Sequence, residues 1–79
     1  MNRKELISFT RYMKRNAYKM LMENKRKIIE IQDQAKKEHR FPNIKEITII
    51  NQLQDNIIEL DALIDEFNIS LRQLSCATW

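Results

Sequence analysis

Acidic side chains are concentrated in the second half of the sequence, at spacings that place several of them on one side of a helix. Asp55, Glu59 and Glu66 follow one another at intervals of four and seven residues, which bring side chains onto the same helix face. Asp61 and Asp65 form a second pair one turn apart. Carboxylates arranged in this way can orient water or a metal ion at a phosphoryl centre. The alternative is that they only keep the outer face of the helix hydrated.

Basic and aromatic side chains are interleaved in the first half. From Lys4 onward, basic residues recur at intervals of seven, four and four, so they share a helix face that could follow the phosphates of a nucleic acid while tyrosines stack on bases. The residues that this interpretation requires are Arg11, Arg15, Lys19, Tyr12 and Tyr18. A solvated charged face with its tyrosines packed on the core explains the same pattern. No helix–turn–helix spacing is present for sequence-specific reading of DNA.

Residues suited to metal or nucleophilic chemistry are sparse. His39 is the single histidine and Cys76 the single cysteine, so there is no Cys/His cluster with zinc-like spacing and no Ser/His/Asp set. The sequence has no glycine, which excludes the glycine-rich loops that bind phosphate. We therefore predict no metal and no cofactor, and we expect His39 to lie at a helix end.

Composition favours a small helical protein in one domain. The 79 residues are 43% hydrophobic and 32% charged, enough for a single small core. One cysteine cannot form an internal disulfide, and there is neither a signal-peptide pattern nor a run of about 20 apolar residues that could span a membrane. We therefore expect a cytoplasmic protein with no membrane contact. Residues 1–40 carry 12 basic and 5 acidic side chains, whereas residues 41–79 carry 2 and 6, so the two halves have opposite charge.

A single proline separates two helical segments. Pro42 disfavours helical geometry at the residue before it, which should end the first helix near His39 or Arg40. Asn43 is then the predicted cap of the second helix, because Glu46 stands at the spacing of a capping box. The predicted elements are a helix at about 4–39, a turn at 40–43, a helix at about 44–74 and a short tail at 75–79.

The second segment carries the clearest apolar pattern in the sequence. Its apolar residues alternate spacings of three and four, as in a coiled coil, and are Ile50, Leu53, Ile57, Leu60, Ile64, Phe67, Leu71 and Leu74. Ile47, Ile58 and Ile69 widen this face, which favours a helical bundle.

The apolar stripe of the first segment is less regular. It consists of Leu6, Phe9, Met13, Ala17, Leu21, Ile28, Ile31 and Ala35, with Asn24 on the same stripe. The polar run at 23–27 leaves open a kink that would divide this helix and give three helices.

Together these patterns predict an all-α protein, an antiparallel two-helix hairpin that forms one domain over residues 1–79. Two helices side by side leave apolar flanks uncovered. We therefore expect self-association into a bundle as a homodimer, or docking on a partner protein.

Part of the second helix resembles a known family of regulators. Glu59-Leu60-Asp61, followed by Leu63-Ile64 and Phe67, is similar to the Ser-Gln-Glu-Leu-Asp signature, apolar pair and aromatic of the small two-helix aspartyl-phosphate phosphatases that act on the sporulation response regulator. The stretch 22–29, in which Arg26 lies between Met22 and the isoleucines at 28 and 29, is similar to an apolar stretch with a central arginine in their first helix. In place of the Ser and Gln of that signature, this sequence has two isoleucines, at 57 and 58.

The resemblance implies a helical hairpin that acts on a response regulator. Asp61 would be the catalytic acidic residue, and Arg26, Glu59 and Leu60 would contact the regulator.

We predict a small regulatory or adaptor protein that docks a helical face on a partner protein, with a response regulator as the specific candidate. Binding is expected without catalysis; an enzyme of this kind would be an aspartyl-phosphate phosphatase. Three alternatives stay open: a basic helical protein that binds nucleic acid, a phage or mobile-element inhibitor of a host protein, and a purely structural oligomer.

Overall fold

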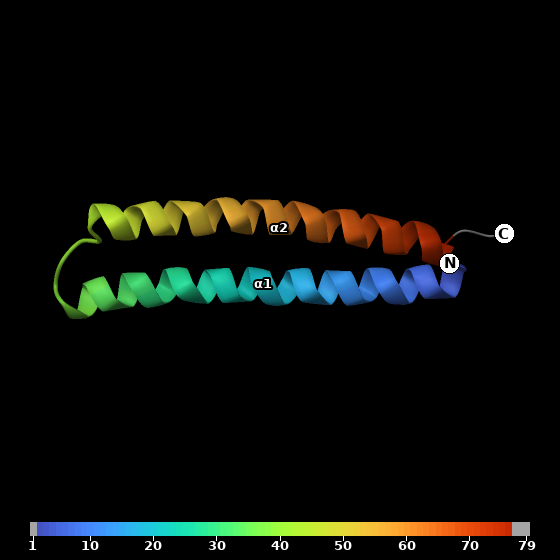
Figure 1. The fold of residues 1–79 in the computed structure, drawn as a ribbon, viewed down its shortest axis with the longest axis horizontal. Coiled ribbons are helices and arrows are strands. Elements are labelled where there is room, and N and C mark those ends of the chain that lie inside the picture. The colour runs from blue at the N-terminus through green and yellow to red at the C-terminus, as the bar shows by residue number, and fades with distance from the viewer. Residues whose placement is uncertain (1, 77–79) are drawn as a thin grey trace.

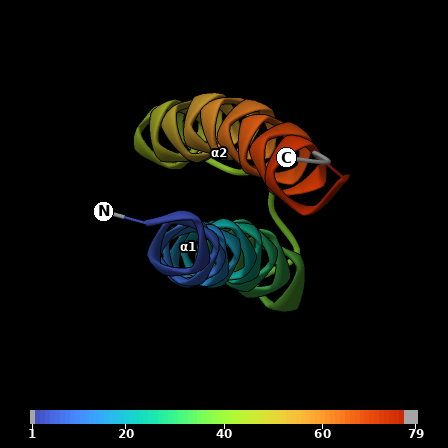
Figure 2. The same cartoon turned by 90° about the vertical axis from the view of Figure 1, so that its right-hand side faces the viewer.

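Two long helices account for nearly all of the computed structural model, which describes residues 2–76. Helix α1 (Arg3–Lys37) and helix α2 (Ile44–Cys76) run antiparallel, side by side, and form a rod of 60 × 17 × 15 Å (Figure 1). The end-on view shows that, in this part of the chain, no third element covers either side of the pair (Figure 2). The predicted all-α hairpin is confirmed. Of the tail predicted at 75–79, residues 75 and 76 belong to α2, and 77–79 lie outside the described residues.

Helix α1 passes through the polar run at 23–27 without interruption, so the alternative with three helices is wrong. None of these five residues is a helix breaker. Arg26 forms ion pairs with Glu23 (4.0 Å) and Glu30 (3.6 Å), at the i,i+3 and i,i+4 spacings that stabilise a helix. Side chains of one helix therefore support each other locally where the apolar pattern is weakest.

Helix α1 ends two residues earlier than predicted because its C-terminus is closed by a Schellman motif. The His39 amide donates to the Lys36 carbonyl (3.0 Å), and the Arg40 amide donates to the Ala35 carbonyl (3.1 Å). This geometry requires a left-handed residue between cap and turn, and His39 takes that conformation with a φ of 55°. His39 thus lies at the helix end, as expected.

Helix α2 begins at Ile44, as predicted, with the expected capping box. The Asn43 side chain accepts a hydrogen bond from the Glu46 amide (2.9 Å), and the Glu46 carboxylate accepts one from the Asn43 amide (3.0 Å). Two amides that have no partner within the helix are thereby satisfied.

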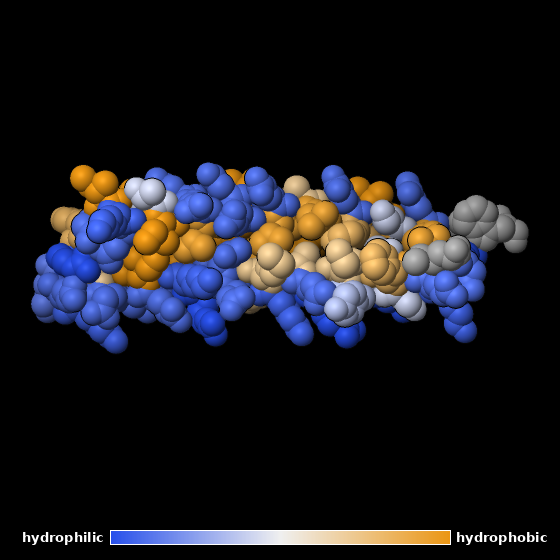
Figure 3. Space-filling model, in the orientation of Figure 1, coloured by the Kyte–Doolittle hydropathy of each residue, from blue (hydrophilic) through white to orange (hydrophobic). Residues whose placement is uncertain are grey.

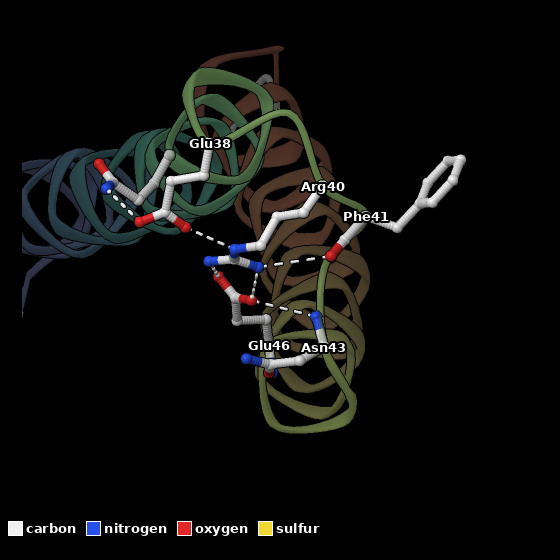
Figure 4. A network of polar contacts seen from close by, with 6 residues as sticks. Glu38, Arg40, Phe41, Asn43 and Glu46 are labelled. Atoms are coloured by element: carbon white, nitrogen blue, oxygen red, sulfur yellow. Dashed lines mark hydrogen bonds and ion pairs between the residues drawn. The ribbon is translucent and has the colours of Figure 1, made fainter.

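An arginine clamp ties this cap to the end of α1 (Figure 4). The Arg40 guanidinium pairs with Glu38 and with Glu46 (2.6 Å between Nη1 and Oε1), and it donates to the Phe41 carbonyl (3.3 Å). Hydrogen bonds from Arg40 hold the pKa values of both carboxyls below their usual range. The turn is therefore held by side chains as well as by backbone caps.

The open end of the hairpin is closed by Arg3. Its Nε donates to the Leu74 carbonyl (2.6 Å) near the C-terminus of α2. Carbonyls in the last turn of a helix lack a partner within the helix, and the last turn of α2 contains no basic residue of its own. Arg3 therefore supplies from α1 the positive charge that complements the negative end of the α2 dipole.

The seam between the helices follows the predicted pattern in α2. Ile50 is buried, and the other seven residues of the predicted stripe are half-buried. On the opposite side, Ala17, Leu21 and Ala35 of α1 are buried. These four are the buried hydrophobic residues of the described chain, so the core is thin.

The predicted stripe of α1 is wrong in its N-terminal part. Leu6, Phe9 and Met13 are 38%, 52% and 37% exposed, whereas the residues at the seam are the half-buried Ile7, Thr10 and Lys14. The seam residues keep alternating spacings of three and four along the whole helix, because residues at these spacings stay on the side that faces the other helix. In this part of the sequence, each residue of the apolar stripe stands one position before a seam residue. One residue along a helix corresponds to a turn of about 100°, so the stripe drifts out of the seam by that angle.

Candidate functional site

The drift of the stripe leaves Leu6, Phe9 and Met13 beside the seam instead of in it. Met20 continues their row because it follows Met13 at a spacing of seven, and Leu63 of α2 lies beside Met20. We call this row the apolar face, and it consists of Leu6, Phe9, Met13, Met20 and Leu63, which are between 37% and 55% exposed. Figure 3 shows a band of hydrophobic side chains along the rod between the two helices. The hairpin therefore presents on its surface the kind of side chain that usually forms a core.

Two residues predicted to bind a partner belong to this side of the molecule. A shallow depression of about 340 Å³ lies where α1 and α2 meet. Its lining residues are Met20, Asn24, Asn56, Glu59, Leu60 and Leu63. Glu59 and Leu60 are thus brought next to the apolar face, with Met20 and Asn24 contributed by α1. No pattern in the sequence indicated Met20. Asn24 stood on the predicted stripe of the first helix, and the pairing of the helices brings both residues to this depression.

The other two residues of the predicted phosphatase site lie elsewhere. Asp61 and Glu59 flank Leu60 on opposite sides, because two residues along a helix correspond to a turn of about 200°. Asp61 is exposed and, among residues 2–76, has no ion pair or side-chain hydrogen bond. Arg26 lies on the outer side of α1, paired with Glu23 and Glu30. The four residues therefore do not form one surface.

The opposite flank of the seam carries basic residues. A groove of about 400 Å³ is lined by Arg11, Lys14, Arg15 and Tyr18 of α1 and by Leu71 of α2. We call it the basic groove. Arg11, Arg15 and Tyr18 were predicted to act together on a nucleic acid, and the structure brings them together. Lys14 was not in that set. It lies in the groove because the seam positions of α1, which recur at spacings of three and four, include residue 14.

A second, open hollow extends this basic surface along α1. It measures about 590 Å³ and is lined by Tyr18, Lys19, Met22, Glu23 and Arg26. Tyr18 lines both hollows, so it lies at their junction. Lys19 adjoins the basic groove without lining it, and Tyr12, which is 60% exposed, lines neither of the two.

Neither a metal-binding cluster nor a membrane-spanning helix is present in residues 2–76. No three His, Cys, Asp or Glu side chains in that range gather closely enough to hold a metal ion. None of its helices combines the length and the apolar character needed to cross a membrane.

The chain matches no protein-family model, and no curated protein or solved structure is significantly similar to it. The resemblance to the small phosphatases, carried by Glu59-Leu60-Asp61, stays a prediction.

Proposed function

We propose that the protein is a non-catalytic helical adaptor that docks its apolar face on a partner protein. The observation that carries the proposal is the position of Leu6, Phe9 and Met13. These side chains are displaced from the seam and remain 37–52% exposed, so a part of the about 1.5–3 kcal/mol that full burial of such a side chain contributes is not gained from α2. A partner surface can supply the burial that the second helix does not.

The side of the rod is large enough for a specific interface. A side of 60 by 17 Å has an area on the order of 1,000 Å², whereas a stable protein–protein interface buries roughly 800 Å² on each partner. Exposed aromatic and methionine side chains such as Phe9, Met13 and Met20 are of the types enriched at interfaces.

The partner that we propose is the receiver domain of a response regulator. Its support is the resemblance at Glu59-Leu60-Asp61, of which Glu59 and Leu60 line the depression beside the apolar face. Asp61 lies on the other side of Leu60, and Arg26 lies on the outer surface of α1. An enzyme that completes the active site of its partner must hold its catalytic group and its docking residues on one surface. We therefore expect binding without dephosphorylation.

Met20 and Met22 provide a matched test of the docking surface. They are the same residue type on one helix, 55% and 48% exposed, but Met20 lines the depression on the apolar face and Met22 the hollow on the basic side. Against a panel of purified receiver domains, calorimetric titration should show that Met20→Glu weakens binding by about tenfold or more, because a charge enters the centre of the interface. Met22→Glu should bind as the wild type does.

Phosphate release from the phosphorylated receiver is measured in parallel. It should proceed at the same rate with and without the protein, and Asp61→Asn should change neither binding nor rate. Accelerated release that Asp61→Asn abolishes would contradict the non-catalytic proposal. If no receiver binds and Met20→Glu instead disrupts a dimer in sedimentation experiments, the apolar face is occupied by a second copy of the chain.

A further inference from the structure

The basic groove lies on the opposite flank of the seam from the apolar face, so docking through that face leaves it accessible. Three cationic side chains, Arg11, Lys14 and Arg15, line it together with Tyr18. None of the three forms an ion pair within residues 2–76, whereas Arg26 and Arg40 in the same range each pair with two glutamates. Charges that are unpaired and close together repel one another, so their grouping does not contribute to the stability of the hairpin.

Lys14 gives an independent reason to assign the groove a function. It occupies a seam position between Thr10 and Ala17, where an apolar residue would pack against α2. A lysine there places its charge at the edge of the contact between the helices, and its stem lies along apolar surface while the ammonium group reaches the solvent. The side chain is half-buried and lines the groove beside Leu71. Leucine at this position would stabilise the fold more than lysine does, whereas lysine adds a third cation to the groove.

Tyr18 distinguishes the groove from a merely basic surface. Its side chain is 53% exposed. It lines the basic groove together with Arg11 and Arg15, and it lines the second hollow together with Lys19. An exposed aromatic ring beside a row of cations is the arrangement that binds single-stranded nucleic acid, in which phosphates pair with the cations and a base stacks on the ring.

We propose that the basic groove binds single-stranded nucleic acid, with phosphates on Arg11, Lys14 and Arg15 and a base stacked on Tyr18. From Arg11 to Lys19 the surface extends about 12 Å along α1, and to Arg26 about 22 Å, at ~1.5 Å per residue. That length suits a short segment of a flexible strand. This binding goes beyond the proposed docking on a protein and uses the other side of the rod.

Fluorescence anisotropy with labelled 15-nucleotide oligo(dT) and oligo(U) tests the proposal. Affinity should fall with salt, with a slope of log K against log salt of about −2, from three phosphate contacts at ~0.7 each. Arg15→Gln should reduce that slope by about 0.7. Tyr18→Leu should weaken binding by about tenfold or more at constant slope, because it removes stacking and no charge. Tyr12→Leu, which alters an exposed tyrosine outside the groove, is the matched control and should have no effect.

Lys14→Leu separates a binding role from a structural one, because it should change stability and affinity in opposite directions. Leucine at the seam should raise the melting temperature, and loss of the cation should lower the affinity for oligo(dT). Unchanged affinity in this variant would overturn the proposal.

The proposal is also wrong if inorganic polyphosphate or anionic phosphatidylserine vesicles bind as tightly as oligo(dT) and Tyr18→Leu has no effect, since the surface then recognises charge alone. Met20→Glu should leave oligo(dT) binding unchanged, so failure of the docking proposal and failure of this one give different results.

Discussion

At the scale of single residues, the turn combines one unfavourable backbone conformation with several favourable side-chain contacts. His39 lies in the left-handed region at the position where helices most often have glycine. A side chain with a Cβ is strained there by roughly 1 kcal/mol or more. The caps and the Arg40 clamp on either side hold the chain in this conformation. The turn is thus ordered without any of the glycine that such turns usually contain.

His39→Gly should stabilise the protein. Glycine adopts a φ of 55° without strain, although it also gains freedom in the unfolded chain, so the net increase in the free energy of unfolding should be about 0.5–1 kcal/mol. Urea denaturation followed by circular dichroism measures this change. Lys37→Gly, two residues earlier and inside α1, is the control and should cost up to about 1 kcal/mol. Destabilisation by both substitutions would show that the left-handed geometry at residue 39 is wrong.

At the scale of elements, the hairpin depends on contacts that join the ends of its helices. Arg40 links Glu38, after α1, to Glu46 in the first turn of α2, and Arg3 links the start of α1 to Leu74 of α2. Both arginines connect segments that packing alone would join weakly, because the core between the helices has so few buried residues. Ionisable groups at the turn therefore make the pairing of the helices sensitive to pH.

Acid should weaken the turn through Glu46. Hydrogen bonds from Arg40 and from the Asn43 amide lower the pKa of this carboxyl from 4.5, so its contribution to stability is present above about pH 4.5 and is lost as the pH falls through the lowered pKa. Glu46→Gln should destabilise the protein at pH 7, and the difference from the wild type should shrink below pH 4. Thermal melts between pH 2.5 and 7 provide the measurement.

Glu66→Gln is the control, since it removes one negative charge from a side chain that is exposed and forms no ion pair within residues 2–76. A constant difference between wild type and Glu46→Gln across the whole pH range would contradict the role assigned to the clamp.

At the scale of the whole molecule, the hairpin is a thin rod with two chemically different flanks. One flank presents the apolar face and the other the basic groove, and the seam between them contains only four buried hydrophobic residues in the described part of the chain. A pair of helices has no interior in which to enclose a substrate, so both flanks are suited to binding extended partners. An adaptor that contacts a protein on one side and a nucleic acid on the other is compatible with this shape.

Stability should depend on whether the apolar face is covered. If a second copy of the chain occupies the face, the melting temperature should rise with protein concentration, because association stabilises the folded state by mass action. Met20→Glu should remove that dependence, and Met22→Glu should retain it. A melting temperature that is independent of concentration from 1 to 100 µM would leave the face free for another protein.

The two helices and the N-terminal cap of α2 could be predicted because their causes are local. Pro42 limits the first helix, Asn43 and Glu46 stand at capping spacing, and the regular stripe from Ile50 to Leu74 specifies the inner side of α2. Each signal acts within a few residues along the chain. The two-residue error at the end of α1 is local as well, but no glycine marked the left-handed position that His39 takes.

The sides of α1 were decided only by its pairing with α2. In the sequence, Leu6, Phe9 and Met13 are better seam residues than Ile7, Thr10 and Lys14, because they are uniformly apolar. A long helix in contact with another must nevertheless keep one register, and the packing of Ala17, Leu21 and Ala35 fixes that register for the whole of α1. The N-terminal stripe is consequently turned to one flank of the seam, where it forms part of the apolar face, and Lys14 is turned toward α2, which completes the basic groove.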